Sequence, residues 1–306
     1  MINTNTRKSK DTALSGKRIH KSKFTETFMH VLFFLAACVS VAAVFLICFF
    51  MFVKGCPAIG KIGVVEFLTG TSWRPQDSPA SFGILPMIVG SVYVTAGAII
   101  VGVPVGLLAA IFMSNFCPKK LYKFLVPPIN LLAGIPSIVY GFFGMVVIVP
   151  FIRKVFGETG NSIVTASILL GIMILPMVIG MSESALKAVP KEYYEGAVAL
   201  GATHERAVCT VIFPAAKSGI LAAVILAIGR AIGETMAVIM IAGNQPRMPK
   251  GILQGVRTLT ANIVLEMSYA TGIHYDALIG TGVVLFVFIL GLNVIFNVLT
   301  HRKGEN

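Results

Sequence analysis

The sequence contains six long apolar segments, and this recurrence constrains the fold more than any other feature. The segments cover residues 28–53, 82–113, 125–152, 162–181, 214–242 and 277–299. About 20 apolar residues are enough for a helix to cross the hydrocarbon core of a bilayer. Only 12% of the residues are charged, against about 25% in soluble domains. We therefore expect an all-α polytopic membrane protein with six transmembrane helices.

Basic residues predict how these segments are oriented. If both termini lie on the inner side, that side holds 16 Lys and Arg residues and the outer side holds 8. Cytoplasmic loops of membrane proteins carry such an excess of basic residues. We therefore interpret the net charge of +12 as a topology signal and not as a sign of nucleic-acid binding. The prediction is a multi-pass protein of the cell (inner) membrane, in contact with the lipid bilayer, with both termini in the cytoplasm.

The same pattern predicts the organisation of the chain. Residues 1–27 form a basic cytoplasmic tail, 28–53 the first transmembrane helix and 54–81 an extracytoplasmic loop. Residues 82–300 form a transmembrane domain of five helices. That domain contains the longest inner loop, the polar segment 183–213, and an outward-facing loop at 244–275.

The polar segment 183–213 has apolar residues at roughly helical spacing, and Gly201 interrupts them. This pattern predicts two short helices joined by a turn. Such an element suits docking into a groove on a soluble partner, and it equally suits a helix on the membrane surface. Within the segment, we expect His204 to be an ordinary exposed helix residue.

Two charged residues, Arg230 and Glu234, lie inside the fifth apolar segment. Their spacing predicts a shared helix face, and Arg230 lies roughly 18 Å along the helix from Ser218. A charge near the centre of a bilayer costs roughly 2.5–3.5 kcal/mol. The pair is therefore either an ion pair that permits burial or an anion site, because a guanidinium group suits a tetrahedral oxyanion.

The third apolar segment is interrupted by Pro136, which Ser137 and Tyr140 follow closely. Their hydroxyl groups suit two roles. They either line a transport path or satisfy the backbone groups that the proline leaves without hydrogen bonds.

One motif resembles the signature of a known family. Glu195, Gly196, Ala197, Gly201 and Pro214 follow the pattern E-A-A, three residues, G, nine residues, I-x-L-P, with conservative departures that include Gly196. The chain thereby resembles the permease subunits of bacterial ABC importers. The resemblance implies a type I ABC importer permease fold, and it implies that this loop is the coupling element that sits in a cleft of the ATPase subunit.

Four further stretches resemble the phosphate-specific importer permeases, specifically the PstC type. They are FGILPMIVGS at 82–91, GIPSIVYGFFG at 134–144, GRAIGETMAV at 229–238 and TLTANIVLEM at 258–267. The resemblance implies import of inorganic phosphate along a path that includes Arg230 and Glu234. It also implies three kinds of partner: a PstA-type sister permease, a dimeric PstB-type cytoplasmic ATPase and a PstS-type extracytoplasmic phosphate-binding protein.

The chain contains no phosphate-binding loop of the form G-x-x-x-x-G-K-[ST]. We therefore expect a transport subunit that is not itself an enzyme and has no cofactor, with ATP and Mg on the partner ATPase. The alternatives are a permease for another tetrahedral oxyanion, sulfate or molybdate, or a self-sufficient secondary transporter. The coupling signature argues against the secondary transporter, and the sequence has no nucleophile or acid pair that supports a membrane enzyme.

Overall fold

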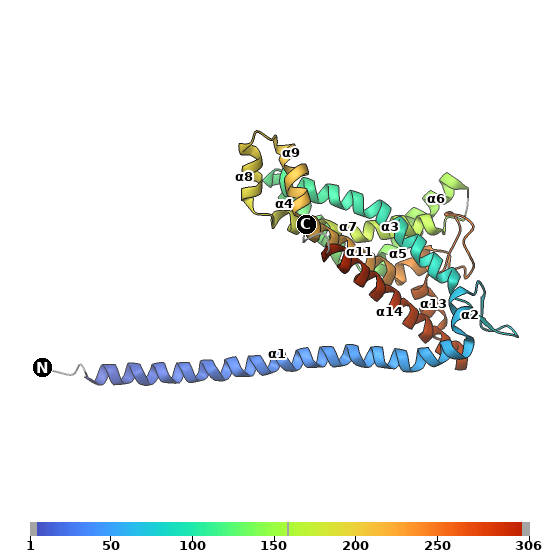
Figure 1. Ribbon diagram of the computed structural model, residues 1–306, viewed down its shortest axis with the longest axis horizontal. Helices are drawn as coiled ribbons and strands as arrows, with labels where there is room; N and C mark the ends of the chain where they lie inside the picture. The colour runs from blue at the N-terminus through green and yellow to red at the C-terminus, as the bar shows by residue number, and fades with distance from the viewer. Residues whose placement is uncertain (1–4, 158, 302–306) are drawn as a thin grey trace. The chain divides into compact units, whose positions relative to one another are not determined.

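The computed structural model describes residues 5–157 and 159–301, and these residues are mainly helical (Figure 1). Residues 1–4 of the predicted basic tail and residues 302–306 lie outside the described part. The helices in chain order are α1 (Asn5–Ile62), α2 (Val64–Thr69), α3 (Leu85–Ile111), α4 (Lys119–Gly134), α5 (Ser137–Phe143), α6 (Val149–Phe156), α7 (Ile163–Lys187), α8 (Lys191–Ala199), α9 (His204–Ala207), α10 (Phe213–Ala215), α11 (Lys217–Gly233), α12 (Met236–Ile241), α13 (Leu259–Glu266) and α14 (Gly272–His301).

Short elements of other kinds complete the described part of the chain. Three π-helical turns continue α-helices: η1 (Phe112–Phe116), η2 (Gly144–Ile148) and η3 (Val208–Ile212). A small antiparallel hairpin joins β1 (Trp73–Arg74) to β2 (Ser81–Phe82), with Trp73 opposite Phe82. The chain divides into two units, residues 1–53 and 54–306.

In its described part, the first unit consists of helix α1 alone. The helix includes residues 5–27 of the predicted tail and the whole first apolar segment. It continues to Ile62, already within the second unit, so the first third of the predicted loop 54–81 is helical.

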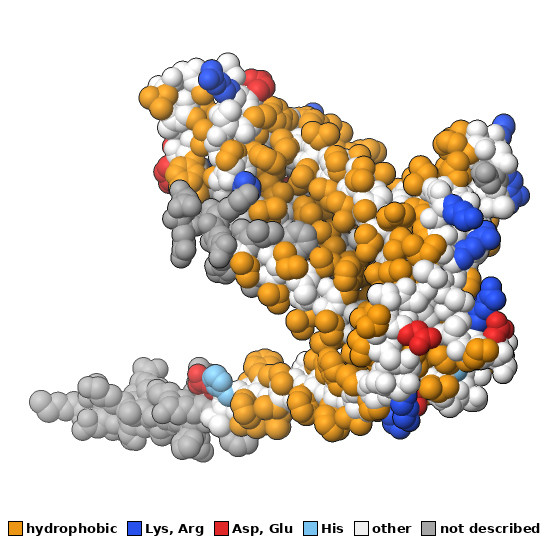
Figure 2. All heavy atoms as spheres, turned by 45° about the vertical axis from the view of Figure 1, so that its right-hand side comes forward, with side chains coloured by type: hydrophobic (Ala, Val, Ile, Leu, Met, Phe, Trp, Pro, Cys, Tyr) orange, Lys and Arg blue, Asp and Glu red, His pale blue; other side chains and the backbone are white. Residues whose placement is uncertain are grey.

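The described residues include five helices that are long and apolar enough to cross a membrane, or six if one bent pair forms a single span. The prediction of an all-α, multi-pass membrane protein is confirmed. The five are Glu26–Ile62, Leu85–Phe116, Ser137–Phe156, Ile163–Lys187 and Gly272–Ile295, and the pair joins His204–Ala215 to Lys217–Gly233 at 67°. On the face of the second unit that Figure 2 shows, hydrophobic side chains cover the middle and charged ones gather toward the ends.

The core of the second unit forms where α3 crosses α7. The two helices approach closely because glycines face the contact: a Cβ added to Gly102 would lie 2.7 Å from the carbonyl oxygen of Gly171. Small residues are the usual means by which membrane helices pack together. The central side chains, including Leu169, Leu170 and Ile174, are at most 1% exposed.

The third apolar segment does not form the span predicted at 125–152. Helix α4 ends at Gly134, Pro136 has an extended backbone, and the spanning helix starts at Ser137. The physical reason is that a residue before proline is displaced from the helical region of backbone conformation.

The prediction of one continuous helix over residues 214–242, the fifth apolar segment, is also wrong. Helix α11 ends at Gly233, Glu234 adopts an extended conformation with ψ 130°, and α12 starts at Met236. A broken helix is tolerated within a membrane where neighbouring groups satisfy its free backbone atoms.

Candidate functional site

The coupling segment forms the predicted helix, turn and helix at one end of the second unit, away from α2 and α6 (Figure 1). Helix α7 extends to Lys187, and α8 starts at Lys191 after Pro190. The turn is a Schellman motif: the N–H of Ala202 donates to the carbonyl of Ala197 at 3.0 Å, and the N–H of Gly201 donates to Val198 at 2.9 Å. Gly201 has φ 86°, a left-handed conformation that glycine adopts without the strain of a Cβ.

His204 holds the coupling segment to the rest of the protein. Its Nδ1 lies 2.9 Å from the Tyr194 hydroxyl of α8, and its Nε2 lies 3.1 Å from the carbonyl oxygen of Asn115 in η1. Its ring packs against Phe116 with centroids 4.8 Å apart. The expectation of an ordinary exposed residue is wrong, because these three contacts leave His204 half-buried.

The signature residues of the coupling segment lie on its outer surface. Glu195, Gly196, Gly201 and Pro214 are exposed, and Ala197 is half-buried. Large apolar side chains accompany them, and Leu200 is 92% exposed. Exposed apolar side chains that gather on one element indicate a surface for a partner.

Arg230 and Glu234 do not share a helix face, contrary to the prediction. Arg230 lies in the last turn of α11 and is exposed, whereas Glu234 lies just beyond the helix. Among the described residues, no carboxylate lies within 4.0 Å of the Arg230 guanidinium group. The two side chains are close in sequence and make no ion pair with each other.

Glu234 stabilises the break between α11 and α12. Its carboxylate accepts a hydrogen bond from the backbone N–H of Ala237 at 3.3 Å, in the first turn of α12. Its carbonyl oxygen accepts a hydrogen bond from the Thr260 hydroxyl at 3.1 Å. Backbone groups that the break would leave free are thus paired by a side chain of the same segment and by α13.

Tyr140 is buried beside the break at Pro136, and its hydroxyl has a backbone partner. It is only 6% exposed, and its hydroxyl donates to the carbonyl oxygen of Leu132 at 2.8 Å, across the break at Pro136. Ser137, the first residue of α5, is half-buried.

The two broken segments lie against each other. Helix α5 packs on α12 so closely that a Cβ on Gly141 would lie 3.0 Å from the Cα of Ala237 and 2.7 Å from the Sδ of Met240. The motif at 134–144 and the motif at 229–238 therefore form one structural unit. Tyr140, Arg230 and Glu234 all belong to it.

The sequence analysis missed a buried charged cluster centred on Glu266. Its carboxylate lies 2.5 Å from an Arg257 guanidinium nitrogen and 2.8 Å from His274 Nε2, and it accepts a hydrogen bond from the Trp73 indole N–H at 2.8 Å. The Arg257 guanidinium also donates to the Asn262 side chain at 3.1 Å. The available signal was the only tryptophan of the chain, placed in a polar loop.

This cluster ties the β1–β2 hairpin to α13, α14 and the loop before α13. Glu266 and Trp73 are 6% and 4% exposed, so the carboxylate is held away from bulk water. The rings of Phe82 and Tyr269 pack against the His274 ring, with centroid distances of 6.5 Å and 6.0 Å. The arrangement is suited to structural stabilisation rather than to catalysis, because every polar atom of the carboxylate is occupied.

The described residues thus form an all-α membrane domain in which two broken segments pack against each other and which carries an exposed coupling segment. Comparison with solved structures supports this fold. A chain of the MetNI methionine ABC transporter, in an inward-facing form, matches 72% of this chain and 94% of its own length with a TM-score of 0.54 and 21% identity. A chain of an amino acid ABC transporter matches 71% of this chain with a TM-score of 0.52.

The family described as "Binding-protein-dependent transport system inner membrane component" matches residues 102–302, and this chain belongs to it. A relative from Bacillus subtilis, named probable ABC transporter permease protein YqgH, is 38% identical over 87% of this chain and 88% of its own length. A relative from Xylella fastidiosa, named phosphate transport system permease protein PstC, is 30% identical over 99% of this chain and 98% of its own length. The corresponding protein of Mesorhizobium japonicum is 34% identical over 72% of this chain.

The family membership determines the type of protein. The chain is a multi-pass membrane transport subunit of an ABC importer, and such permease subunits have no ATPase site of their own. An ATPase and other subunits complete such a transporter.

Proposed function

We propose that this chain is the PstC-type permease subunit of an ATP-driven importer of inorganic phosphate. The observation that carries the proposal is the likeness to relatives named phosphate transport system permease protein PstC, which extends over as much as 99% of this chain. Arg230 beside a helix break supports it, because its guanidinium group has no carboxylate partner among the described residues and is free to bind an oxyanion.

The proposed path follows the exposed side of α11 and the two breaks. Arg230 offers a bidentate donor to phosphate. The negative charge of Glu234 near the break shortens the stay of a fully ionised anion. The Glu234 carboxylate can also accept a hydrogen bond from a protonated anion. Ser137 and Tyr140 complete the path at the neighbouring break. Monohydrogen phosphate carries such a proton and sulfate does not, so the pair favours phosphate.

The proposed coupling surface is formed by Glu195, Gly196, Ala197, Gly201 and Pro214. This surface docks into a cleft of a dimeric PstB-type ATPase in the cytoplasm, where ATP and Mg are bound. A PstA-type sister permease forms the other half of the path. A PstS-type binding protein delivers phosphate from the extracytoplasmic side, and both termini of this chain lie in the cytoplasm.

The test is the double substitution Arg230→Met with Glu234→Met in the assembled importer. Arg230 and Glu234 make no ion pair with each other, so replacing both leaves no charge that has lost its partner, and the substitution removes one hydrogen bond, from the Ala237 N–H to the Glu234 carboxylate. We expect the variant to assemble with its partners and to lose phosphate uptake. Lys217→Met, at the opposite end of α11, removes an exposed charge as a matched control and should keep uptake. Uptake at the wild-type rate by the double variant would contradict the proposed path.

A further inference from the structure

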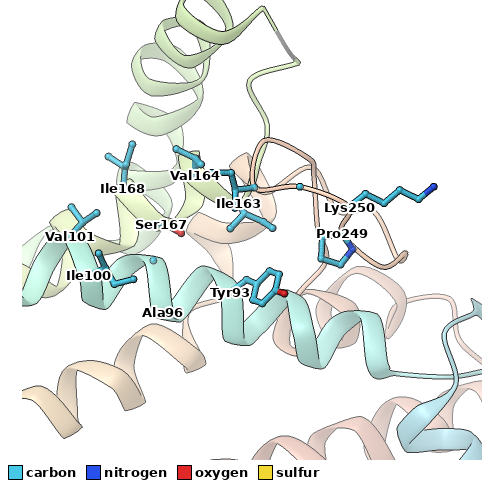
Figure 3. Close-up of a pocket in the computed structure, with 13 residues that line it drawn as sticks. Tyr93, Ala96, Ile100, Val101, Ile163, Val164, Ser167, Ile168, Pro249 and Lys250 are labelled. Carbon is cyan, nitrogen blue, oxygen red and sulfur yellow. The ribbon is translucent and has the colours of Figure 1, made fainter.

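An apolar groove runs between the two helices that form the core of the second unit. It has a volume of about 570 Å³ and is lined by α3, by the first part of α7 and by residues 249–252 of the loop before α13 (Figure 3). Among the described residues that line it, none belongs to α11, which carries Arg230. The groove is therefore separate from the proposed phosphate path.

The groove is polar at one end and apolar at the other. The side chains of Ile100 and Val101 lie at its apolar end, whereas the Tyr93 hydroxyl and the Lys250 ammonium group point the opposite way (Figure 3). The one hydroxyl on its floor, that of Ser167, already donates to the carbonyl oxygen of Val94 at 3.2 Å. Because this hydroxyl is already paired, the part of the groove around Ser167 suits an apolar ligand.

The position of Lys250 is set by the backbone around it. The N–H of Val164 donates to the carbonyl of Ile252 at 3.1 Å, and the N–H of Ile163 donates to Gln254 at 3.1 Å, so the loop is fastened to the start of α7. The Gln254 side chain accepts from the Lys250 N–H at 3.1 Å. Among the described residues, no carboxylate lies within 4.0 Å of the Lys250 ammonium group, and Arg247 adds a second positive charge in the same loop.

We propose that this groove binds a phospholipid with an anionic headgroup. Both α3 and α7 are long and apolar enough to cross a membrane, and Ile100 and Val101 in the groove are exposed, so the groove offers an open apolar surface to an acyl chain. An acyl chain lies along Ile100 and Val101, and the headgroup phosphate pairs with Lys250 and accepts a hydrogen bond from Tyr93. A lysine near a bilayer surface attracts anionic lipids in this way, and tyrosine is typical of the interface.

The test uses the full-length protein in nanodiscs with photoactivatable phosphatidylglycerol or, separately, photoactivatable phosphatidylcholine. Mass spectrometry locates the lipid on the peptides that contain residues 93–101 and 163–168. We expect the wild-type protein to favour phosphatidylglycerol by about fivefold, which corresponds to ~1 kcal/mol for one basic group at the surface. The variant Lys250→Glu should lose this preference, whereas Lys154→Glu, also an exposed lysine outside the groove, should keep it.

A second variant tests the apolar part of the groove. Ala96 is exposed and lines the groove, so Ala96→Phe should lower crosslinking of both lipids to these peptides. Leu108→Phe, on a part of α3 outside the groove, is its control. If Ala96→Phe fails to accumulate, the lipid preference of Lys250→Glu is a sufficient test, because that variant changes only an exposed side chain. Equal crosslinking of the two lipids to the wild-type protein, or an unchanged preference in Lys250→Glu, would overturn the proposal.

Discussion

Replacement of Glu266 by alanine should be the most destabilising single change at the end of the protein that carries the β1–β2 hairpin. The Glu266 carboxylate has three partners within 2.8 Å: Arg257, His274 and Trp73. The Arg257 side chain is only 14% exposed. Removal of the carboxylate therefore leaves a guanidinium group that water reaches poorly and that no other carboxylate neutralises within the described residues.

The magnitude follows from this burial. Breaking a buried ion pair by removing one partner costs about 3–5 kcal/mol. Glutamine at the same position retains an acceptor and loses the charge, so Glu266→Gln should cost about 1.5–3 kcal/mol, the range for hydrogen bonds to charged groups. Removing both charges with Arg257→Met and Glu266→Met should recover part of the loss, because no unpaired charge remains.

The assay is equilibrium unfolding of the purified protein in mixed micelles, followed by tryptophan fluorescence. The chain has one tryptophan, and it lies in this cluster at 4% exposure, so its emission reports directly on the hairpin. Glu66→Ala, which removes an exposed carboxylate, is the control and should change stability by about 0.5 kcal/mol at most. A free energy of unfolding for Glu266→Ala within about 1 kcal/mol of wild type would refute the reasoning, since buried ion pairs that lose one partner cost more than that.

Three other predictions test the coupling segment, the helix break and the topology. Gly201→Val forces a β-branched residue to φ 86°, so we expect insertion in the membrane to persist while phosphate uptake and co-purification of the ATPase are lost; normal values of both would contradict a coupling role. Tyr140→Phe removes the hydrogen bond from the Tyr140 hydroxyl to the carbonyl oxygen of Leu132, and it should lower the free energy of unfolding by about 0.5–1.5 kcal/mol in the same assay. An unchanged free energy of unfolding would contradict this role of the hydroxyl. Cysteine at the exposed position 200, in a background without the native cysteines, should react with an impermeant reagent only after cells are opened; labelling of intact cells would reverse the proposed orientation.

Sequence alone was sufficient for the features that depend on local chemistry. The length and composition of the apolar segments predicted a multi-pass helical protein, because crossing a bilayer requires about 20 apolar residues irrespective of their neighbours. The turn at Gly201 was equally predictable, since a glycine that interrupts a helical pattern marks a turn. The family signature at 195–214 is local in the same sense, and it identified the segment that the fold exposes.

Tertiary structure decided the features that depend on distant neighbours. Apolar residues continue on both sides of Glu234 and Thr235, so the composition did not show that α11 ends at Gly233. The break is stable because the Thr260 hydroxyl, from α13, donates to the carbonyl oxygen of Glu234. His204 is half-buried for the same reason, since its partner Asn115 lies 89 positions away in the chain.

The Glu266 cluster shows this limit most clearly, because Trp73 donates to a carboxylate that lies 193 positions further along the sequence. Each of its charged residues, taken alone, has the appearance of an exposed loop or helix-end residue. Only the packing of the hairpin against α13 and α14 removes water from them. A charge in such a site is stable only when its partners are brought within hydrogen-bonding distance, and this depends on the fold as a whole.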